Sequence, residues 1–122
     1  MLPALLLLAT LPAWIPARWH SSDPRSLDLL AETPVNCVLL EEPLWDLPFL
    51  REAARRNIAT LGVVHPNADL PKQASRAAGL PMSGVVLEGA FEPAAAERLR
   101  ADLADSRTPV IELPSLRGHP AA

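Results

Sequence analysis

Four residues that can act as acids, bases or ligands recur at nearly even spacing along the chain. They are Glu41, His65, Glu88 and Glu112, and the steps from each to the next are almost equal. Each of them ends a short apolar run. Carboxylates and an imidazole that gather at one place can transfer protons or bind a polar ligand. Whether these four gather depends on the elements that carry them.

The apolar runs are predicted to be β-strands, because they are short, rich in Val, Leu and Ile, and bounded by turn residues. We expect strands at residues 35–40, 59–64, 83–87 and 109–113. Strands that are apolar on both faces and alternate with helices indicate a parallel sheet. The sequence therefore predicts an α/β fold of repeated β-α units with a four-stranded parallel sheet. Ligands of such folds bind beyond the carboxyl ends of the strands, where all four residues would lie on one rim.

The segments between the strands carry helix signals. Asp46 and Asp69 are each followed by a proline two residues later, and Pro93 opens a third helical stretch. A capping side chain before a proline in the first turn is typical of a helix start. Ser22-Asp23-Pro24 carries the same signature ahead of the first strand, and Gly79 is predicted to end the second helix as a left-handed C-cap.

Two architectures are compatible with four strands and three connecting helices. One is a small doubly wound sheet, and the other is the first half of an eight-stranded α/β barrel that stops early. The length of the repeated β-α unit is compatible with both architectures. The sequence also gives no sign of a reversal of strand order, so neither observation decides between them. A half barrel leaves its strand edges open, so self-association is expected if this architecture is the right one.

Length and charge limit the classes of function. With 122 residues the chain forms one domain at most. The net charge is −3 with both signs interspersed, so the chain lacks the basic face that nucleic-acid binding requires. Cys37 is the single cysteine and cannot form an intrachain disulfide. It lies in or beside the first strand, where we expect a small buried side chain and no nucleophile.

Residues 1–17 are apolar and contain no charged side chain. With three prolines the segment is too short and too interrupted for a stable membrane span. It resembles the apolar core of a secretory signal peptide, with Ala17 as a cleavage position, although no Lys or Arg precedes it. The protein is therefore predicted to be exported, to the periplasm or the extracellular space, with a β-α domain at 18–115 and a tail at 116–122. The alternative is that the apolar segment forms a buried first strand or helix of that domain.

The rim suggests a division of roles. Glu41, Glu88 and Glu112 are the candidate catalytic residues, because paired carboxylates can divide acid and base roles when their environments differ. The candidate ligand-binding residues are His65, Trp45 and Asn67, and the indole ring of Trp45 would offer an apolar plate to a sugar ring. The alternative for each glutamate is a solvated residue that merely ends its strand.

Other chemistries lack their motifs. His65 and the glutamates are ordinary metal ligands, but the chain has no H-x-x-x-H or H-x-H pair, so no metal site is predicted. The phosphate-binding glycine motifs are absent, so no nucleotide is expected, and no cofactor of any kind is predicted. The chain also lacks a G-x-S-x-G elbow.

The leader, the β-α units with acidic strand ends and the Trp in the first loop together resemble the opening half of secreted (β/α)8-barrel proteins of the glycoside-hydrolase type. The resemblance covers about residues 18–115. It implies a carbohydrate ligand and an acid/base glutamate at the end of the fourth strand, the position of Glu112. In those families an Asn precedes that glutamate, whereas Ile111 does so here, and their nucleophile comes from a seventh strand. The alternatives are a non-catalytic ligand-binding or interaction module, or a truncated barrel without activity of its own.

Overall fold

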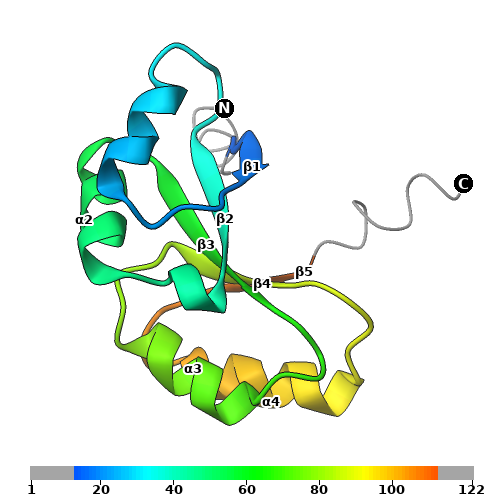
Figure 1. Cartoon of the computed structure of the whole chain (residues 1–122). Coiled ribbons are helices and arrows are strands. Elements are labelled where there is room, and N and C mark those ends of the chain that lie inside the picture. The colour runs from blue at the N-terminus through cyan, green and yellow to red at the C-terminus, as the bar shows by residue number, and fades with distance from the viewer. Residues whose placement is uncertain (1–12, 113–122) are drawn as a thin grey trace, which may run out of the picture.

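The computed structural model of the protein describes residues 13–112, which form an α/β fold around one parallel sheet (Figure 1). All neighbouring strands are parallel and follow each other in chain order. The strands are β1 (Pro16–Arg18), β2 (Cys37–Glu41), β3 (Ala59–Val64), β4 (Gly84–Leu87) and β5 (Val110–Glu112). The predicted fold class is confirmed, and the four predicted strands correspond to β2 to β5.

The fifth strand, β1, differs from the prediction of four strands and matches in position the alternative of a first strand in the apolar segment, although it is mostly exposed. It pairs with β2 at the sheet edge, where Pro16 lies beside Cys37. The side chain of Asn36 holds the approach to β1, since its Oδ1 accepts from the backbone N–H of Ile15 at 2.7 Å. Ala17, the predicted cleavage position, lies within β1. Residues 1–12 of the predicted signal peptide, and the tail at 116–122, lie outside the described residues.

Four of the five described helices begin where the sequence predicted them, and the short helix at Glu42–Leu44 was not predicted. The five helices are η1 (Pro24–Leu30), η2 (Glu42–Leu44), α2 (Leu47–Arg55), α3 (Leu70–Ala78) and α4 (Pro93–Leu103), of which η1 and η2 are 3₁₀ helices. Asp23, Asp46 and Asp69 each accept a hydrogen bond from a backbone N–H in the first turn of η1, α2 and α3. Each cap satisfies a donor that the helix itself leaves free. No described helix is long and apolar enough to cross a membrane.

The prediction of a left-handed C-cap at Gly79 was wrong. Gly79 has a φ of −92°, and its N–H donates to the carbonyl of Arg76 at 3.1 Å. This tight last turn leads into β4 without a left-handed residue. The left-handed conformation occurs instead after α2, at Asn57 with a φ of 61°, and after α4, at Arg107 with a φ of 59°. Asn tolerates it better than most residues that have a Cβ.

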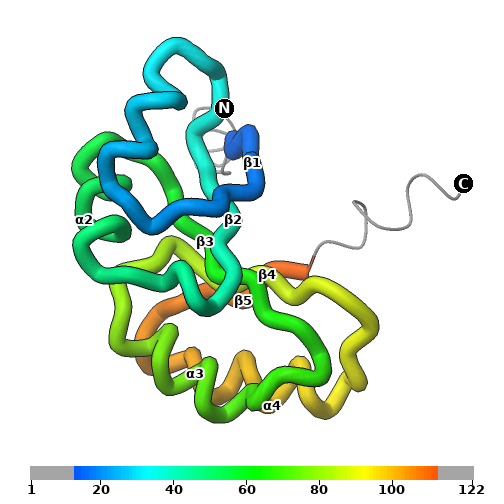
Figure 2. Tube along the Cα trace, viewed as in Figure 1, coloured from blue at the N-terminus to red at the C-terminus, as the bar shows by residue number. Residues whose placement is uncertain are grey.

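Four of the described helices, η1, α2, α3 and α4, pack on one face of the sheet, which we call the helix-covered face. Figure 2 shows η1 and α2 beside β2 and β3, and α3 and α4 together at the other end of the sheet. Their largest buried side chains include Phe49, Leu50, Leu99 and Leu103, which join one core cluster with Val38, Leu40 and Val85. A doubly wound sheet has helices on both faces and a reversal of strand order. The described residues have neither feature: their strands follow chain order and their helices pack on one face.

The opposite face, against which none of the helices within residues 13–112 packs and which we call the helix-free face, has its own apolar cluster. It consists of Cys37, Leu39, Leu61, Val63 and Val86, with Trp14, Ala59 and Ile111 packed beside them. Cys37 is fully buried, and burial raises the pKa of its thiol to about 11. The thiol is therefore protonated at neutral pH, and the prediction of a small buried side chain is confirmed.

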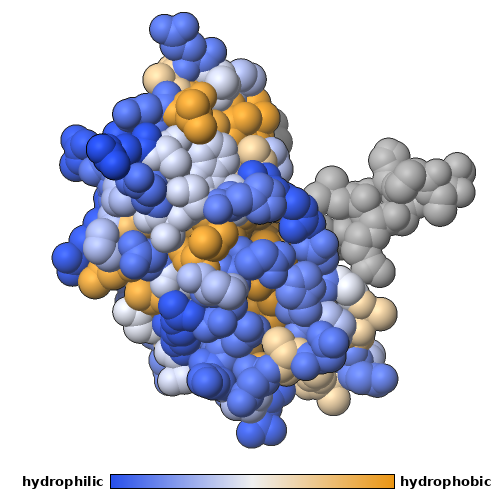
Figure 3. Space-filling view, in the orientation of Figure 1, coloured by the Kyte–Doolittle hydropathy of each residue, from blue (hydrophilic) through white to orange (hydrophobic). Residues whose placement is uncertain are grey.

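The face of the molecule seen in Figure 3 is mostly hydrophilic, with apolar residues in small groups between hydrophilic ones. Among the described large apolar side chains, only Leu29 and Ile15 are markedly exposed, at 75% and 47%. Scattered exposure of this kind is normal for a folded domain.

Candidate functional site

The register of the strands decides which polar side chains meet at the carboxyl end of the sheet. Side chains alternate between the faces of a strand, and directly paired residues share a face. Arg18 pairs with Leu39, and Glu41 lies two positions beyond Leu39, so both point to the helix-free face. His65 and Glu88 lie two positions beyond the paired Val63 and Val86 on the same face. We call Arg18, Glu41, His65 and Glu88 the rim cluster.

The four side chains of the rim cluster contact one another. The guanidinium of Arg18 donates to Glu88 Oε2 at 2.6 Å, and its other terminal nitrogen lies 3.7 Å from Glu41 Oε2. His65 Nε2 lies 2.8 Å from Glu41 Oε1, a hydrogen-bond distance. One ligand atom from each of Glu41, His65 and Glu88 lies within 4.8 Å of the others. Three of the four predicted strand-end residues therefore meet, as the spacing predicted.

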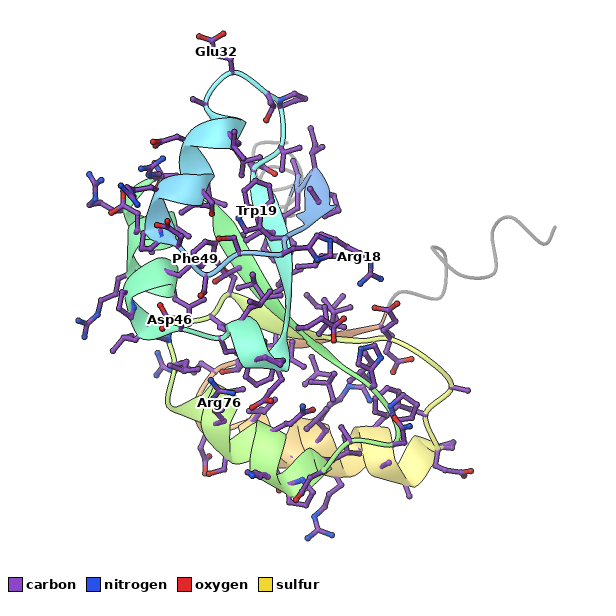
Figure 4. All side chains as sticks on the ribbon, viewed as in Figure 1. Arg18, Trp19, Glu32, Asp46, Phe49 and Arg76 are labelled. Atoms are coloured by element: carbon purple, nitrogen blue, oxygen red, sulfur yellow. The ribbon has the colours of Figure 1, made fainter. Side chains whose placement is uncertain are left out.

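Arg18 was not predicted to be part of the site. It comes from β1, and Figure 4 shows it projecting from that strand on the side away from α2. Its hydrogen bond with Glu88, assisted by the charge of Glu41, raises the pKa of the guanidinium, so it stays a cation. The signal was present in the sequence, because one more step of the same length, taken back from Glu41, reaches Arg18.

The loops behind the rim cluster lie close to each other. Gly89 follows Glu88 and has a φ of +114°, a conformation that residues with a side chain rarely adopt. A Cβ at this position would lie 2.7 Å from Cδ of Pro66, which follows His65. The absence of a side chain at Gly89 thus lets the loop after β4 pass close to Pro66 at the end of β3.

Glu112 does not join the rim cluster. It pairs with Leu87, whose side chain belongs to the helix-covered face, and it forms an ion pair with Arg100 of α4. The even spacing in the sequence wrongly grouped Glu112 with the other three residues, because the sequence offset between paired residues differs from one strand pair to the next. Partners on β4 and β5 are farther apart in the sequence than partners on β2 and β3. A change of one residue in register places a side chain on the opposite face.

Trp45 lies in the core and offers no ring face to a sugar. Its side chain is 2% exposed, its indole N–H donates to the carbonyl of Leu40 at 2.9 Å, and the guanidinium of Arg76 lies 5.6 Å from the ring centre. The ring packs against Gly62 of β3, where a Cβ would come within 2.6 Å of it. The absence of a side chain at Gly62 is what admits the indole beneath the sheet.

Arg76 is a second residue that the sequence analysis did not single out. From α3 it donates to the carbonyls of Glu42 and Trp45 and pairs with the carboxylate of Glu42. It therefore holds the loop after β2 in place behind the rim cluster. The last candidate, Asn67, is exposed in the turn that follows His65.

The rim cluster presents hydrogen-bond donors and acceptors side by side. Arg18 supplies N–H donors, the two glutamates supply acceptor oxygens, and His65 supplies either, depending on its tautomer. Between 35% and 50% of each side chain is exposed, so each has capacity left for a ligand. With His65 neutral, the formal charge of the cluster is that of one carboxylate.

Comparison with known proteins returned no match, whether to protein-family models, to curated proteins or to solved structures.

Proposed function

We propose that the rim cluster binds a neutral polyhydroxylated ligand, foremost a carbohydrate. The observation that carries the proposal is the convergence of Arg18, Glu41, His65 and Glu88 from four neighbouring strands on one half-exposed rim. Sugar hydroxyls are both donors and acceptors, so they match a surface that alternates the two. An anion would meet two carboxylates and one already neutralised guanidinium, so a neutral ligand fits better.

The wider context of the proposal is an exported α/β protein of the barrel type. The sequential order of the parallel strands and the single helix-covered face support the barrel comparison. Export is supported by the apolar sequence of residues 1–17, acting as an uncleaved signal, because cleavage after Ala17 would remove two of the three residues of β1. We further propose that copies associate through the outer edges of β1 or β5, since an edge strand leaves backbone groups to pair. Light scattering over a concentration series should show a rising mass, and a constant monomer mass contradicts it.

Glycoside hydrolysis is the second candidate, and one distance favours it. Oxygens of Glu41 and Glu88 lie within 4.8 Å of each other, close to the separation of about 5–5.5 Å that retaining enzymes use. Such an enzyme also needs one carboxyl group kept protonated in an enclosed environment. Both carboxylates here are partly exposed and contact Arg18 or His65, so binding without catalysis ranks first.

Binding should be tested with the full chain on a panel of mono- and oligosaccharides, first on an array and then by calorimetry. The informative pair of variants is Glu88→Gln and Glu112→Gln, because both glutamates end strands but only Glu88 belongs to the rim cluster. We expect Glu88→Gln to weaken binding about tenfold, the usual effect of losing one charged hydrogen bond. Glu112→Gln should leave affinity unchanged.

The same samples separate the two candidates. Release of a chromogenic aryl group from a glycoside, lost in Glu41→Gln and Glu88→Gln alike, would establish hydrolysis. Saturable sugar binding without release establishes a binding module. An array with no saturable ligand, or equal losses in Glu88→Gln and Glu112→Gln, rejects the rim cluster as a sugar site.

A further inference from the structure

We infer that the rim cluster also binds a divalent transition-metal ion, with Glu41, His65 and Glu88 as its ligands and Arg18 displaced. This inference does not depend on the sugar proposal, because the ion alone can be measured. Imidazole and carboxylate are the ligand types that ions such as Zn²⁺ accept from proteins. Here they come from three adjacent strands, with one ligand atom of each within 4.8 Å of the other two.

The required movement is small. Zn²⁺ binds nitrogen and oxygen at about 2.0–2.2 Å, so the ligand atoms of a tetrahedral site lie about 3.4 Å apart. Glu41 Oε1 and His65 Nε2 are already 2.8 Å apart, and Glu88 needs to approach by rotation of its partly exposed side chain. The backbone need not move, because the parallel pairing of β2, β3 and β4 already brings the three strand ends side by side.

Three protein ligands would leave a fourth position to water or a ligand hydroxyl. This is the arrangement of open metal sites, in contrast to closed structural ones with four protein ligands. A bound ion would therefore add to the cluster a position for an oxygen of a bound molecule. No local motif could have predicted the site, since each of its ligands belongs to a different β-α unit.

A cation of the chain itself already occupies this place. The guanidinium of Arg18 lies 2.6 Å from Glu88 and 3.7 Å from Glu41, so it neutralises the two carboxylates that the ion needs. Arg18 is on the edge strand and half of its side chain is exposed, which lets it turn into solvent when an ion enters. Arg18 is therefore a competitor of the ion, and removing its charge should strengthen ion binding.

The experiment is a calorimetric titration of the full chain with Zn²⁺, repeated with Co²⁺, whose absorption reports its ligands. We expect one ion per chain, with affinity at least about tenfold weaker in His65→Ala and in Glu88→Gln. Arg18→Gln should bind about threefold or more tightly, because a nearby positive charge is gone. Glu112→Gln is the matched carboxylate control and should leave binding unchanged. The double variant His20→Ala/His119→Ala tests the other histidines and should also leave it unchanged.

A second measurement locates the ion. Mn²⁺ should broaden the amide signals at the ends of β2, β3 and β4 more strongly than those at the last turn of α2 in a two-dimensional NMR spectrum, while circular dichroism confirms that each variant is folded. Non-saturable binding, or binding that His65→Ala leaves unchanged, overturns the inference, because nonspecific attraction to carboxylates does not need an imidazole. Equal or weaker binding in Arg18→Gln overturns the displacement of Arg18.

Discussion

The two faces of the sheet are built from the same strands but carry different kinds of residues. On the helix-covered face, apolar side chains of the strands meet those of the helices in one large buried cluster. On the helix-free face, a smaller apolar cluster gives way at the carboxyl ends to the rim cluster. The difference follows from alternation, since each strand sends successive side chains to opposite faces. Changes on the first face should affect mainly stability, and changes at the rim mainly binding.

The largest effect is expected from Phe49→Ala on the helix-covered face. Phe49 is fully buried between α2 and the sheet (Figure 4). Truncating a buried Phe costs about 3–5 kcal/mol through lost burial and a residual cavity. Urea denaturation followed by circular dichroism should show this loss, whereas His65→Ala should unfold close to the wild type. Comparable losses of unfolding free energy in the two variants would contradict the expectation that the helix-covered face mainly determines stability and the rim mainly determines binding.

The next effect concerns the apolar part of the helix-free face and depends on pH. Burial raises the pKa of Cys37 from 9.0 to about 11, so the folded state favours the neutral thiol. This contribution is complete below pH 9 and is lost as the pH rises from 9 to 11, where the unfolded thiol ionises first. The expected loss is on the order of 2 kcal/mol.

Urea midpoints at pH 8 and pH 10.5 test this loss, with Cys37→Ala as the comparison. The chain has no tyrosine, and its one lysine, Lys72, is exposed, so few other side chains titrate in this range. The alkaline loss should be present in the wild type and absent in Cys37→Ala. If the wild type and Cys37→Ala lose the same unfolding free energy, the thiol of Cys37 is more accessible to water than the structure indicates.

A smaller effect separates two glycines. Gly62→Ala should destabilise by about 1–3 kcal/mol, because its Cβ would lie 2.6 Å from the Trp45 ring in a filled core. Gly79→Ala is the matched control, with an ordinary φ and its nearest neighbour at 3.7 Å. It should keep or gain stability, by about 0.4–1 kcal/mol, through the unfolded chain. Thermal melts of both variants check this, and equal melting temperatures would contradict the packing of Trp45 against β3.

The smallest effect is expected from Glu112→Gln. Its partner Arg100 is partly exposed, and a surface ion pair contributes less than about 1 kcal/mol. The unfolding free energy should hardly change, and neither should any binding at the rim. A large loss of binding would mean that Glu112 acts with the rim cluster after all.

The sequence was sufficient for the features that local chemistry determines. Strands apolar on both faces identified β2 to β5, and an Asp before a Pro identified the starts of α2 and α3. β1 was predicted only as the alternative for the apolar segment, because its short run continues that segment and includes a proline, a pattern typical of the end of a signal peptide. In the structure, hydrogen bonds from the side chain of Asn36, just before β2, keep this segment beside β2. Its Oδ1 accepts from the N–H of Ile15, and its Nδ2 donates to the carbonyl of Ala13.

The site was only partly predictable because it depends on register. Even spacing correctly grouped Glu41, His65 and Glu88, but the pairing offset grows along the sheet and turns Glu112 to the other face. That offset depends on the connections, for which the sequence holds no simple rule. For Trp45 a signal did exist, since a glycine inside a strand, here Gly62, often marks a close approach.

The positions of the three tryptophans give each face its own optical reporter. Trp14 packs with the cluster of the helix-free face, while Trp19 and Trp45 pack with the core under the helices. Replacing Trp19 and Trp45 with Phe leaves an emission that follows the helix-free face alone. A variant that retains only Trp45, whose indole lies beside the guanidinium of Arg76, follows the other face. Fluorescence could thus time the loss of each face separately as the domain unfolds.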